Sequence, residues 1–371
     1  MDPRIRQLAK KLIKSSVCLQ TGENILIQSS NAASFPLVEA LVDEAYAVGA
    51  RPYLKISDAK ISRAYMRHAT REQLELSEKQ FFELVKNMQA YISLAAVENQ
   101  YEQSDLPKDI LKMAGEIGKP SLDYRVNRTK WCVLRWPTPG MAQTAEMPSE
   151  TFEEFYYKVC LLDYEKMSKA MEVLRILMDK TDKVLITGKG THLEFSIKGI
   201  PADKCDGKKN IPDGEICTAP IRESVNGTVY FTAPTIYDSE RFSGVSLVFK
   251  NGKVADASCE QGSNDKLNDI LNRDEGSRFI GEFAIGLNPH VVKPMLNILF
   301  DEKIAGSFHL ALGQCYDESP NGNNSQIHWD MVCIQTSEYG GGEMYFDDVL
   351  IRKDGRFVLP ELEGLNPENL I

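Results

Sequence analysis

The sequence predicts an α/β N-terminal domain, built on a parallel sheet with flanking helices, followed by a strand-rich α+β C-terminal domain. Three observations carry this prediction: the length of the chain, an α/β alternation in its first half, and a change to strands and tight turns after about residue 180. At 371 residues the chain exceeds what one hydrophobic core usually fills. We therefore expect two domains, at residues 1–180 and 181–371.

Short apolar runs in the first half alternate with helical patterns. The predicted strands are ENILIQS (23–29), RPYLKIS (51–57) and QAYISLAA (89–96), and the helical patterns lie near 36–48 and 72–88. Gly49 follows the first helical pattern and supplies the left-handed residue that commonly ends a helix. Strands joined by helical crossovers run parallel, so these segments form βαβ units of one parallel sheet.

The transition between the domains is predicted from a change of pattern. The strand-like segment WCVLRWP (131–137) leads through a turn into a helical pattern from Ser149 to about Lys180, which ends the first domain. Two β-hairpins are then predicted, at 242–260 around Asn-Gly and at 344–360 around Asp-Gly. These features make the second domain strand-rich.

Composition excludes several classes of function. A net charge of -10 and a pI near 5.2 argue against nucleic-acid and anionic-membrane partners, which select Lys and Arg. No apolar run has the length of a signal-peptide core or a membrane span. We therefore expect a cytoplasmic protein.

The cysteines indicate neither a disulfide framework nor a catalytic thiol. All eight are scattered without a CxxC pair: Cys18, Cys132, Cys160, Cys205, Cys217, Cys259, Cys315 and Cys333. Most are expected to be buried reduced thiols, because a chain of this size needs no disulfide bonds. The segment GKGT (188–191) lacks the rest of a phosphate-binding loop, and no GxSxG motif suggests serine catalysis.

The sharpest chemical signal is His328-Trp329-Asp330 in the strand-like segment SQIHWDMVCI. Residues two apart in a strand point to the same face, so His328 and Asp330 converge while Trp329 points to the opposite layer. This is good geometry for metal ligands. A hydrogen-bonded pair on a solvated face is the alternative.

Three further residues strengthen the metal interpretation. His309 lies in the apolar segment GSFHLALG, where an isolated imidazole is costly unless it has a partner. Glu215 and Glu282 lie at positions where burying an apolar residue would cost less free energy, so each needs a cation partner or becomes neutral by protonation. Arg222 or Arg278 could supply that cation instead of a metal.

The candidate set is therefore Glu215, Glu282, His309, His328 and Asp330. Three carboxylates carry a charge of -3 against +4 for two divalent ions, which leaves a net positive site that favours hydroxide over water. Five ligands suit two metals with one bridging carboxylate. Oxygen and nitrogen ligands without a thiolate fit Zn, Co or Mn and do not choose among them.

Several segments resemble the AmpS/PepS/aminopeptidase T family of leucyl-type metallo-aminopeptidases. They are GENILIQ, EAYAVGARP, PDGEICTAPIRESVNGTV, GEFAIGLNP, FHLALGQCY and SQIHWDMV, in the same order. The resemblance implies that the five candidates are the family's dinuclear metal ligands and that Tyr316 lies beside the metals. It also implies an αβ N-terminal domain and a homodimer enclosing its active sites. The interval between Glu282 and His309 is shorter than the resemblance leads us to expect, so the bordering loop is expected to differ.

These observations predict a metallo-aminopeptidase that uses two divalent ions to hydrolyse the N-terminal bond of a peptide with a free N-terminus. Glu282 or Glu215 is expected to take the proton from the attacking water, and Tyr316 to donate a hydrogen bond to the oxyanion. Simple packing at a loop edge is the alternative for Tyr316. Two rival functions remain: another dinuclear hydrolase, such as a carboxypeptidase or amidohydrolase, and a non-catalytic metal-binding protein.

Overall fold

The structure, a computed structural model, describes residues 1–371. The chain divides into two compact units: unit 1 comprises 1–161 and 207–211, and unit 2 comprises 162–206 and 212–371. The division falls between two helices, α7 (Ser149–Cys160) and α8 (Tyr164–Lys180). No helix in the chain combines the length and the apolar character that crossing a membrane requires.

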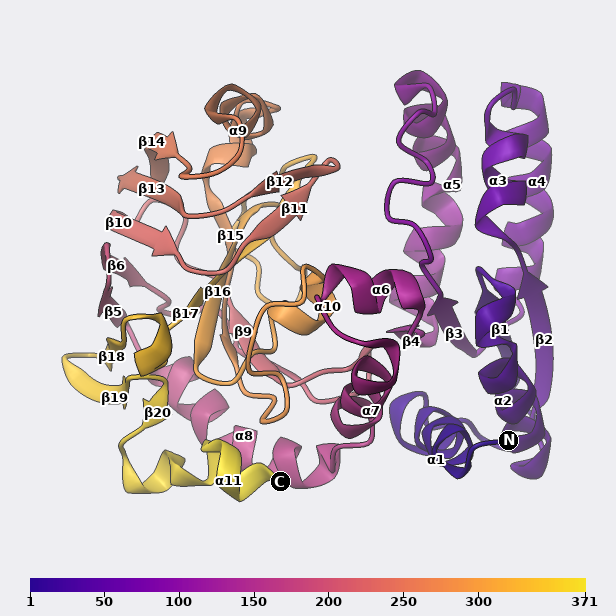
Figure 1. The fold of residues 1–371 in the computed structure, drawn as a ribbon, viewed down its shortest axis with the longest axis horizontal. Helices are drawn as coiled ribbons and strands as arrows, with labels where there is room; N and C mark the ends of the chain where they lie inside the picture. Colours follow the sequence, from indigo (N-terminus) through magenta and orange to yellow (C-terminus); the bar gives the residue numbers. More distant parts are fainter. The chain divides into compact units, whose positions relative to one another are not determined.

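Unit 1 contains the parallel sheet that the sequence predicts (Figure 1). Its strands, in spatial order, are β2 (Arg51–Ile56), β1 (Asn24–Ser29), β3 (Ala90–Ala95), β4 (Lys130–Arg135) and β8 (Asn210–Ile211). All four pairings are parallel. Its helices, besides α7, are α1 (Pro3–Lys11), α2 (Phe35–Ala47), α3 (Ala59–Met66), α4 (Arg71–Val85), α5 (Lys108–Arg128) and α6 (Pro139–Thr144).

Strand β1 is buried on both sides, as a strand in a helix-covered parallel sheet should be. Leu26 packs with Val85 and Tyr91 beneath α4 and α5, whereas α2 contacts β1 and β2 and packs on α1. Gly49 adopts φ +78° at the end of α2, and Thr70 forms a capping box at the start of α4. The predicted fold class of the first half is confirmed.

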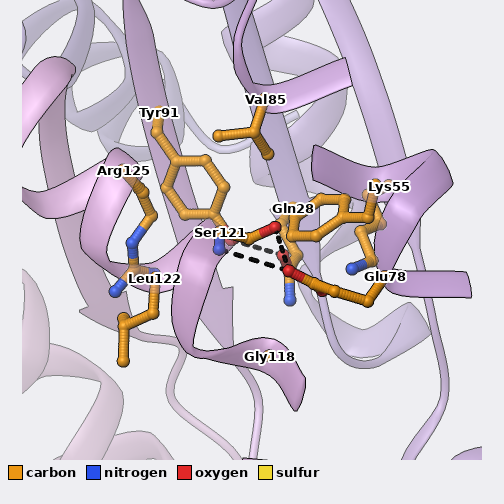
Figure 2. A pocket seen from close by; sticks show the side chains of 10 residues that line it. Gln28, Lys55, Glu78, Val85, Tyr91, Gly118, Ser121, Leu122 and Arg125 are labelled. Carbon is orange, nitrogen blue, oxygen red and sulfur yellow. Dashed lines mark hydrogen bonds between the residues drawn. The ribbon is translucent and has the colours of Figure 1, made fainter. Parts of the chain in front are cut away.

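Unit 1 also encloses a polar cavity of about 250 Å³ between α4, α5 and the sheet (Figure 2). Its polar groups bind one another: Glu78 accepts hydrogen bonds from the backbone and hydroxyl of Ser121, and Tyr91 donates one to Gln28. Part of the polar lining is therefore satisfied internally, whereas Nε of Arg125, also in the lining, is buried without a hydrogen-bond partner in the chain.

Unit 2 is built mainly from two antiparallel sheets. The eight-stranded sheet has the order β14 (Lys253–Ser258), β13 (Val245–Lys250), β10 (Asn226–Phe231), β6 (Thr191–Ser196), β5 (Lys183–Gly188), β18 (Gly342–Phe346), β19 (Val349–Lys353), β20 (Arg356–Phe357). The five-stranded sheet has the order β17 (His328–Ile334), β16 (Ser307–Gly313), β15 (Ile280–Gly286), β9 (Glu215–Thr218), β7 (Asp203–Cys205). The remaining elements are β11 (Thr235–Tyr237), β12 (Glu240–Phe242), α9 (Asn264–Leu271), α10 (Ile298–Asp301) and α11 (Pro367–Leu370).

Both turn dipeptides lie where the sequence predicts hairpins. Asn251 and Gly252 adopt φ +50° and +83° between β13 and β14, and Asp354 and Gly355 adopt φ +48° and +80° between β19 and β20. Positive φ at both central residues is what a two-residue hairpin turn of this type requires.

Two local predictions were wrong. The helical pattern from Ser149 to Lys180 is two helices, because Asp163 caps a new helix by accepting a hydrogen bond from the backbone of Lys166. The strand expected from residue 344 to the Asp-Gly turn breaks at Asp347, which has φ +47° and accepts hydrogen bonds from the backbone of Lys183 and its predecessor. Aspartate tolerates this left-handed conformation better than most residues.

Candidate metal centre

The five-stranded sheet of unit 2 brings together every residue predicted as a ligand. The five are Glu215 on β9, Glu282 on β15, His309 on β16, and His328 and Asp330 on β17. Ala311 pairs with both Glu282 and Asp330 across the antiparallel ladders. Paired residues share a face of the sheet, so these carboxylates project from the same side.

Small residues alternate with the ligands on that face. Ala284 pairs with His309, Gly286 with Glu215, and Gly313 with His328. A Cβ on Gly286 would lie 2.4 Å from the carbonyl oxygen of Ile304, and one on Gly313 would lie 2.2 Å from that of Ile327. These small residues let the backbone approach closely and leave room for the longer ligand side chains.

The opposite face of the sheet is apolar, as the alternation predicts. Trp329 lies between His328 and Asp330 in sequence but packs with its ring centroid 5.0 Å from that of Tyr237. Its indole donates a hydrogen bond to Thr235 at 3.1 Å. The packed tryptophan therefore fixes the orientation of the two flanking ligands.

Four of the five residues converge on one point. His328 Nε2 lies 3.2 Å from Glu282 Oε2 and 3.3 Å from Asp330 Oδ1. His309 Nε2 lies 3.6 Å from Glu282 Oε1 and 3.7 Å from Asp330 Oδ1. Glu282, His328 and Asp330 form one group spaced to hold a metal ion.

A second group with ligand spacing adjoins the first. It consists of Glu215, Glu302 and His309, with His309 Nδ1 lying 3.6 Å from Glu215 Oε2. Glu302 follows α10 and was not predicted from the sequence. The signal used for Glu282, a lone carboxylate in an apolar strand pattern, is absent here, because Glu302 lies between Asp301 and Lys303 in a segment without a strand pattern.

The cation beside Glu215 was also missed. It is Lys303, which is 1% exposed and whose ammonium binds Glu215 Oε1, Glu302 at 2.7 Å and Asp213 at 3.5 Å. The alternative of an arginine partner is wrong for both predicted carboxylates. Arg222 binds Glu223 and the amide of Asn323, and Arg278 binds neutral oxygens.

Burial and mutual charge shift the ionisation of the centre. Burial raises the pKa of Glu282, but its interactions with the neighbouring imidazoles of His309 and His328 outweigh burial, so the net shift is downward. Burial lowers the pKa of His309, but the charges of Glu215, Glu282 and Asp330 raise it by more, to about 10. Burial raises the pKa of Glu302 to about 8.

The donor atoms fit divalent ions. Several are buried and have no hydrogen-bond partner in the chain: Glu215 Oε2, both ring nitrogens of His309, His328 Nε2 and Asp330 Oδ1. Unpaired buried polar atoms are costly, and a divalent ion that accepts carboxylate and imidazole ligands removes that cost. The set contains no thiolate. Cys205 and Cys217 lie nearby as free thiols.

Tyr316 lies in the loop between β16 and β17. Its ring centroid is 4.7 Å from that of His328, and the residue is 46% exposed. Removal from water and the charge of Glu282 raise the pKa of Tyr316 well above its usual value, so its hydroxyl remains a donor. The structure thus places Tyr316 beside the predicted ligands.

Asn323 holds this loop in place. The side chain is 1% exposed, donates to the carbonyls of Gly276 and Gly313, and accepts from Arg222. Replacing Asn323 with Leu should lower the free energy of unfolding by about 3 kcal/mol, at about 1 kcal/mol for each lost hydrogen bond. Chemical denaturation measures this. Asn324→Leu at the exposed neighbour is the control, and an equal loss in both variants would contradict the assigned role.

Comparisons with known proteins identify the family of the chain. The profile of the family described as thermophilic metalloprotease (M29) matches residues 1–357. Aminopeptidase 2 of Geobacillus stearothermophilus is 26% identical over 409 aligned residues, covering 96% of this chain and 95% of the relative. Aminopeptidase T of Thermus thermophilus is 25% identical, covering 96% and 98%.

Two solved structures share the fold over nearly the whole chain. Wild-type AmpT from Thermus thermophilus superposes with a TM-score of 0.79 at 21% identity, covering 96% of this chain and 99% of that one. A 2,5-dihydroxypyridine dioxygenase from Pseudomonas putida KT2440 superposes with a TM-score of 0.64 at 14% identity, covering 98% and 99%. At such identities these likenesses establish the fold alone. Because the family profile spans almost its entire length, the chain belongs to the M29 family of metallo-aminopeptidases.

Proposed function

We propose that this chain removes the N-terminal residue from peptides at a centre with two positions for divalent ions. One position is formed by Glu282, His328 and Asp330, the other by Glu215 and Glu302, and His309 lies between them. The observation that supports this most strongly is the convergence of buried donor atoms, unpaired within the chain, from three strands of one sheet.

Divalent ions bound there would polarise the scissile carbonyl, make water a stronger acid and hold the free α-amino group of the substrate. Holding that amino group limits cleavage to one residue from the end. Zn, Co and Mn all suit this donor set.

The chain's own groups have distinct roles in this proposal. The sheet fixes Glu282 between two imidazoles, where its carboxylate accepts the proton of the attacking water and returns it to the leaving amine. Tyr316 donates its hydroxyl proton in a hydrogen bond to the oxyanion that forms on the scissile carbonyl. Tyr316 is 46% exposed, so its side chain is accessible to a substrate.

The test is hydrolysis of Leu-p-nitroanilide and of its N-acetylated form. Protein stripped with a chelator is assayed before and after addition of Zn, Co or Mn. We expect no cleavage without metal and metal-restored cleavage of the free-amine substrate alone. Cleavage of both substrates would instead indicate an amidohydrolase, and cleavage only from the C-terminus of a peptide would indicate a carboxypeptidase. Failure with every metal, repeated on short peptides, would favour a non-catalytic metal protein.

Replacing Tyr316 with Phe should lower kcat by about 100-fold, the typical cost of losing one oxyanion donor, with little change in KM. Steady-state kinetics on Leu-p-nitroanilide measure this. Tyr345→Phe, which removes a hydroxyl bound to Glu343 on β18, is the matched control. Full activity of Tyr316→Phe would reduce this residue to a packing role.

The cytoplasmic location and the homodimer remain predictions from composition and resemblance. Light scattering on the purified protein measures the oligomeric state directly. A monomer that cleaves peptides at the full rate would show that the centre needs no partner subunit.

A further inference from the structure

Lys303 lies inside the proposed centre, and neither the proposed mechanism nor the predicted ligand set uses it. Its ammonium binds carboxylate oxygens of Glu215 and Glu302, the same two residues that with His309 have metal-ligand spacing. The ammonium of Lys303 therefore binds Glu215 and Glu302, two of the three side chains that form one metal position.

The side chain of Lys303 is buried among carboxylates, and hydrogen bonds fix its backbone. Lys303 is 1% exposed, and its third anionic neighbour, Asp213, is also 1% exposed. The backbone is fixed on both sides, since the carbonyl of Lys303 accepts a hydrogen bond from Asn288 at 2.9 Å and its N–H donates to Phe300 at 3.0 Å.

His309 cannot complete both metal positions at once. Its Nδ1 faces Glu215, and its Nε2 faces Glu282 and Asp330. A neutral imidazole has one lone pair and one N–H, so it ligates through one nitrogen only. If Nε2 ligates, Glu282, His309, His328 and Asp330 give four donors to one ion, while Nδ1–H points to Glu215.

We propose that the ammonium of Lys303 takes the place of the second ion, so that the chain binds one divalent ion tightly, on Glu282, His309, His328 and Asp330. A second ion at Glu215 and Glu302 meets a positive charge that already holds their oxygens, in a buried site where like charges repel strongly. This inference rests on the proposed metal centre. The two metal positions then differ in their affinity for a divalent ion, because Lys303 occupies one of them.

The experiment measures binding rather than turnover. Chelator-stripped protein is titrated with Co²⁺, and bound metal is counted by mass spectrometry after equilibrium dialysis. Wild type should bind one Co²⁺ per chain, with any second ion at least about 100-fold weaker. Lys303→Met keeps the length and apolar stem of the side chain but removes the charge, and it should bind two ions with affinities within about tenfold of each other.

Lys204→Met is the matched control, because Lys204 is a partly buried lysine of the same unit that pairs with Glu172 at 2.8 Å, outside the candidate centre. It should keep the wild-type stoichiometry. Anomalous scattering at the cobalt edge from wild-type crystals gives the same answer without any variant: one peak on Glu282, His309, His328 and Asp330.

Two comparable sites in wild type, or one ion in both wild type and Lys303→Met, would overturn the inference. Two comparable sites would mean that the ammonium of Lys303 binds Glu215 on the side away from a metal ion and does not displace that ion. The proposed function can fail separately. A chain that binds one Co²⁺ as expected but cleaves no peptide would keep the role of Lys303 and lose the aminopeptidase proposal.

Discussion

Replacing Glu282 with Gln is expected to lower kcat by about 1,000-fold or more while the protein keeps its fold. The substitution preserves the volume and shape of the side chain but removes a charge that two imidazoles approach, at 3.6 Å and 3.2 Å. It also removes the group assigned to proton transfer. Because Glu282 belongs to the four-donor group, both metal binding and chemistry are affected.

The loss of kcat is measured by steady-state kinetics on Leu-p-nitroanilide with saturating metal. Retention of the fold is measured by circular dichroism. Glu343→Gln on β18 is the matched control, because that carboxylate lies on a different sheet and pairs with Lys353. Activity of Glu282→Gln within a few-fold of wild type would remove Glu282 from both of its assigned roles.

The sequence sufficed to find the candidate ligands that lie on strands. In β17 the period of two puts His328 and Asp330 on one face, and burial of Trp329 on the other face follows from the same rule. Glu282 and His309 could be recognised because a charged or titratable side chain interrupts an apolar strand. The predicted fold class succeeded for the same reason, since apolar periodicity determines which faces are buried.

The remaining members of the centre could not be found this way. Glu302 and Lys303 follow the four-residue helix α10 in a segment without a regular period, so sequence spacing does not say where their side chains point. Lys303 meets Glu215 across 88 residues of sequence. That contact depends on how the segment after β15 packs onto β9, a tertiary outcome that overrides local pattern.

The sequence pattern also did not predict the local breaks in helices and strands. Leu161 to Asp163 separate two helices whose apolar patterns run on almost in phase, and only the capping by Asp163 marks the boundary. Asp347 and Asp348 both adopt positive φ inside what reads as one strand. Each break depends on a short polar side chain binding nearby backbone, which a hydrophobic pattern does not reveal.

Loading the stripped protein with a divalent ion should raise the thermal midpoint of unit 2 by about 8–16 °C. The donors come from segments that only the folded chain brings together, from Glu282 to Asp330, so the ion binds the native state and not the unfolded one. An ion at 1,000 times its Kd stabilises the native state by about 4 kcal/mol, and each kcal/mol is worth about 2–4 °C in a domain of this size. Scanning calorimetry with Co²⁺ or Zn²⁺ measures the shift, and His328→Ala should lose most of it. A metal that restores peptide cleavage without moving the midpoint would have to act outside this sheet, which would contradict the assigned centre while leaving the family assignment intact.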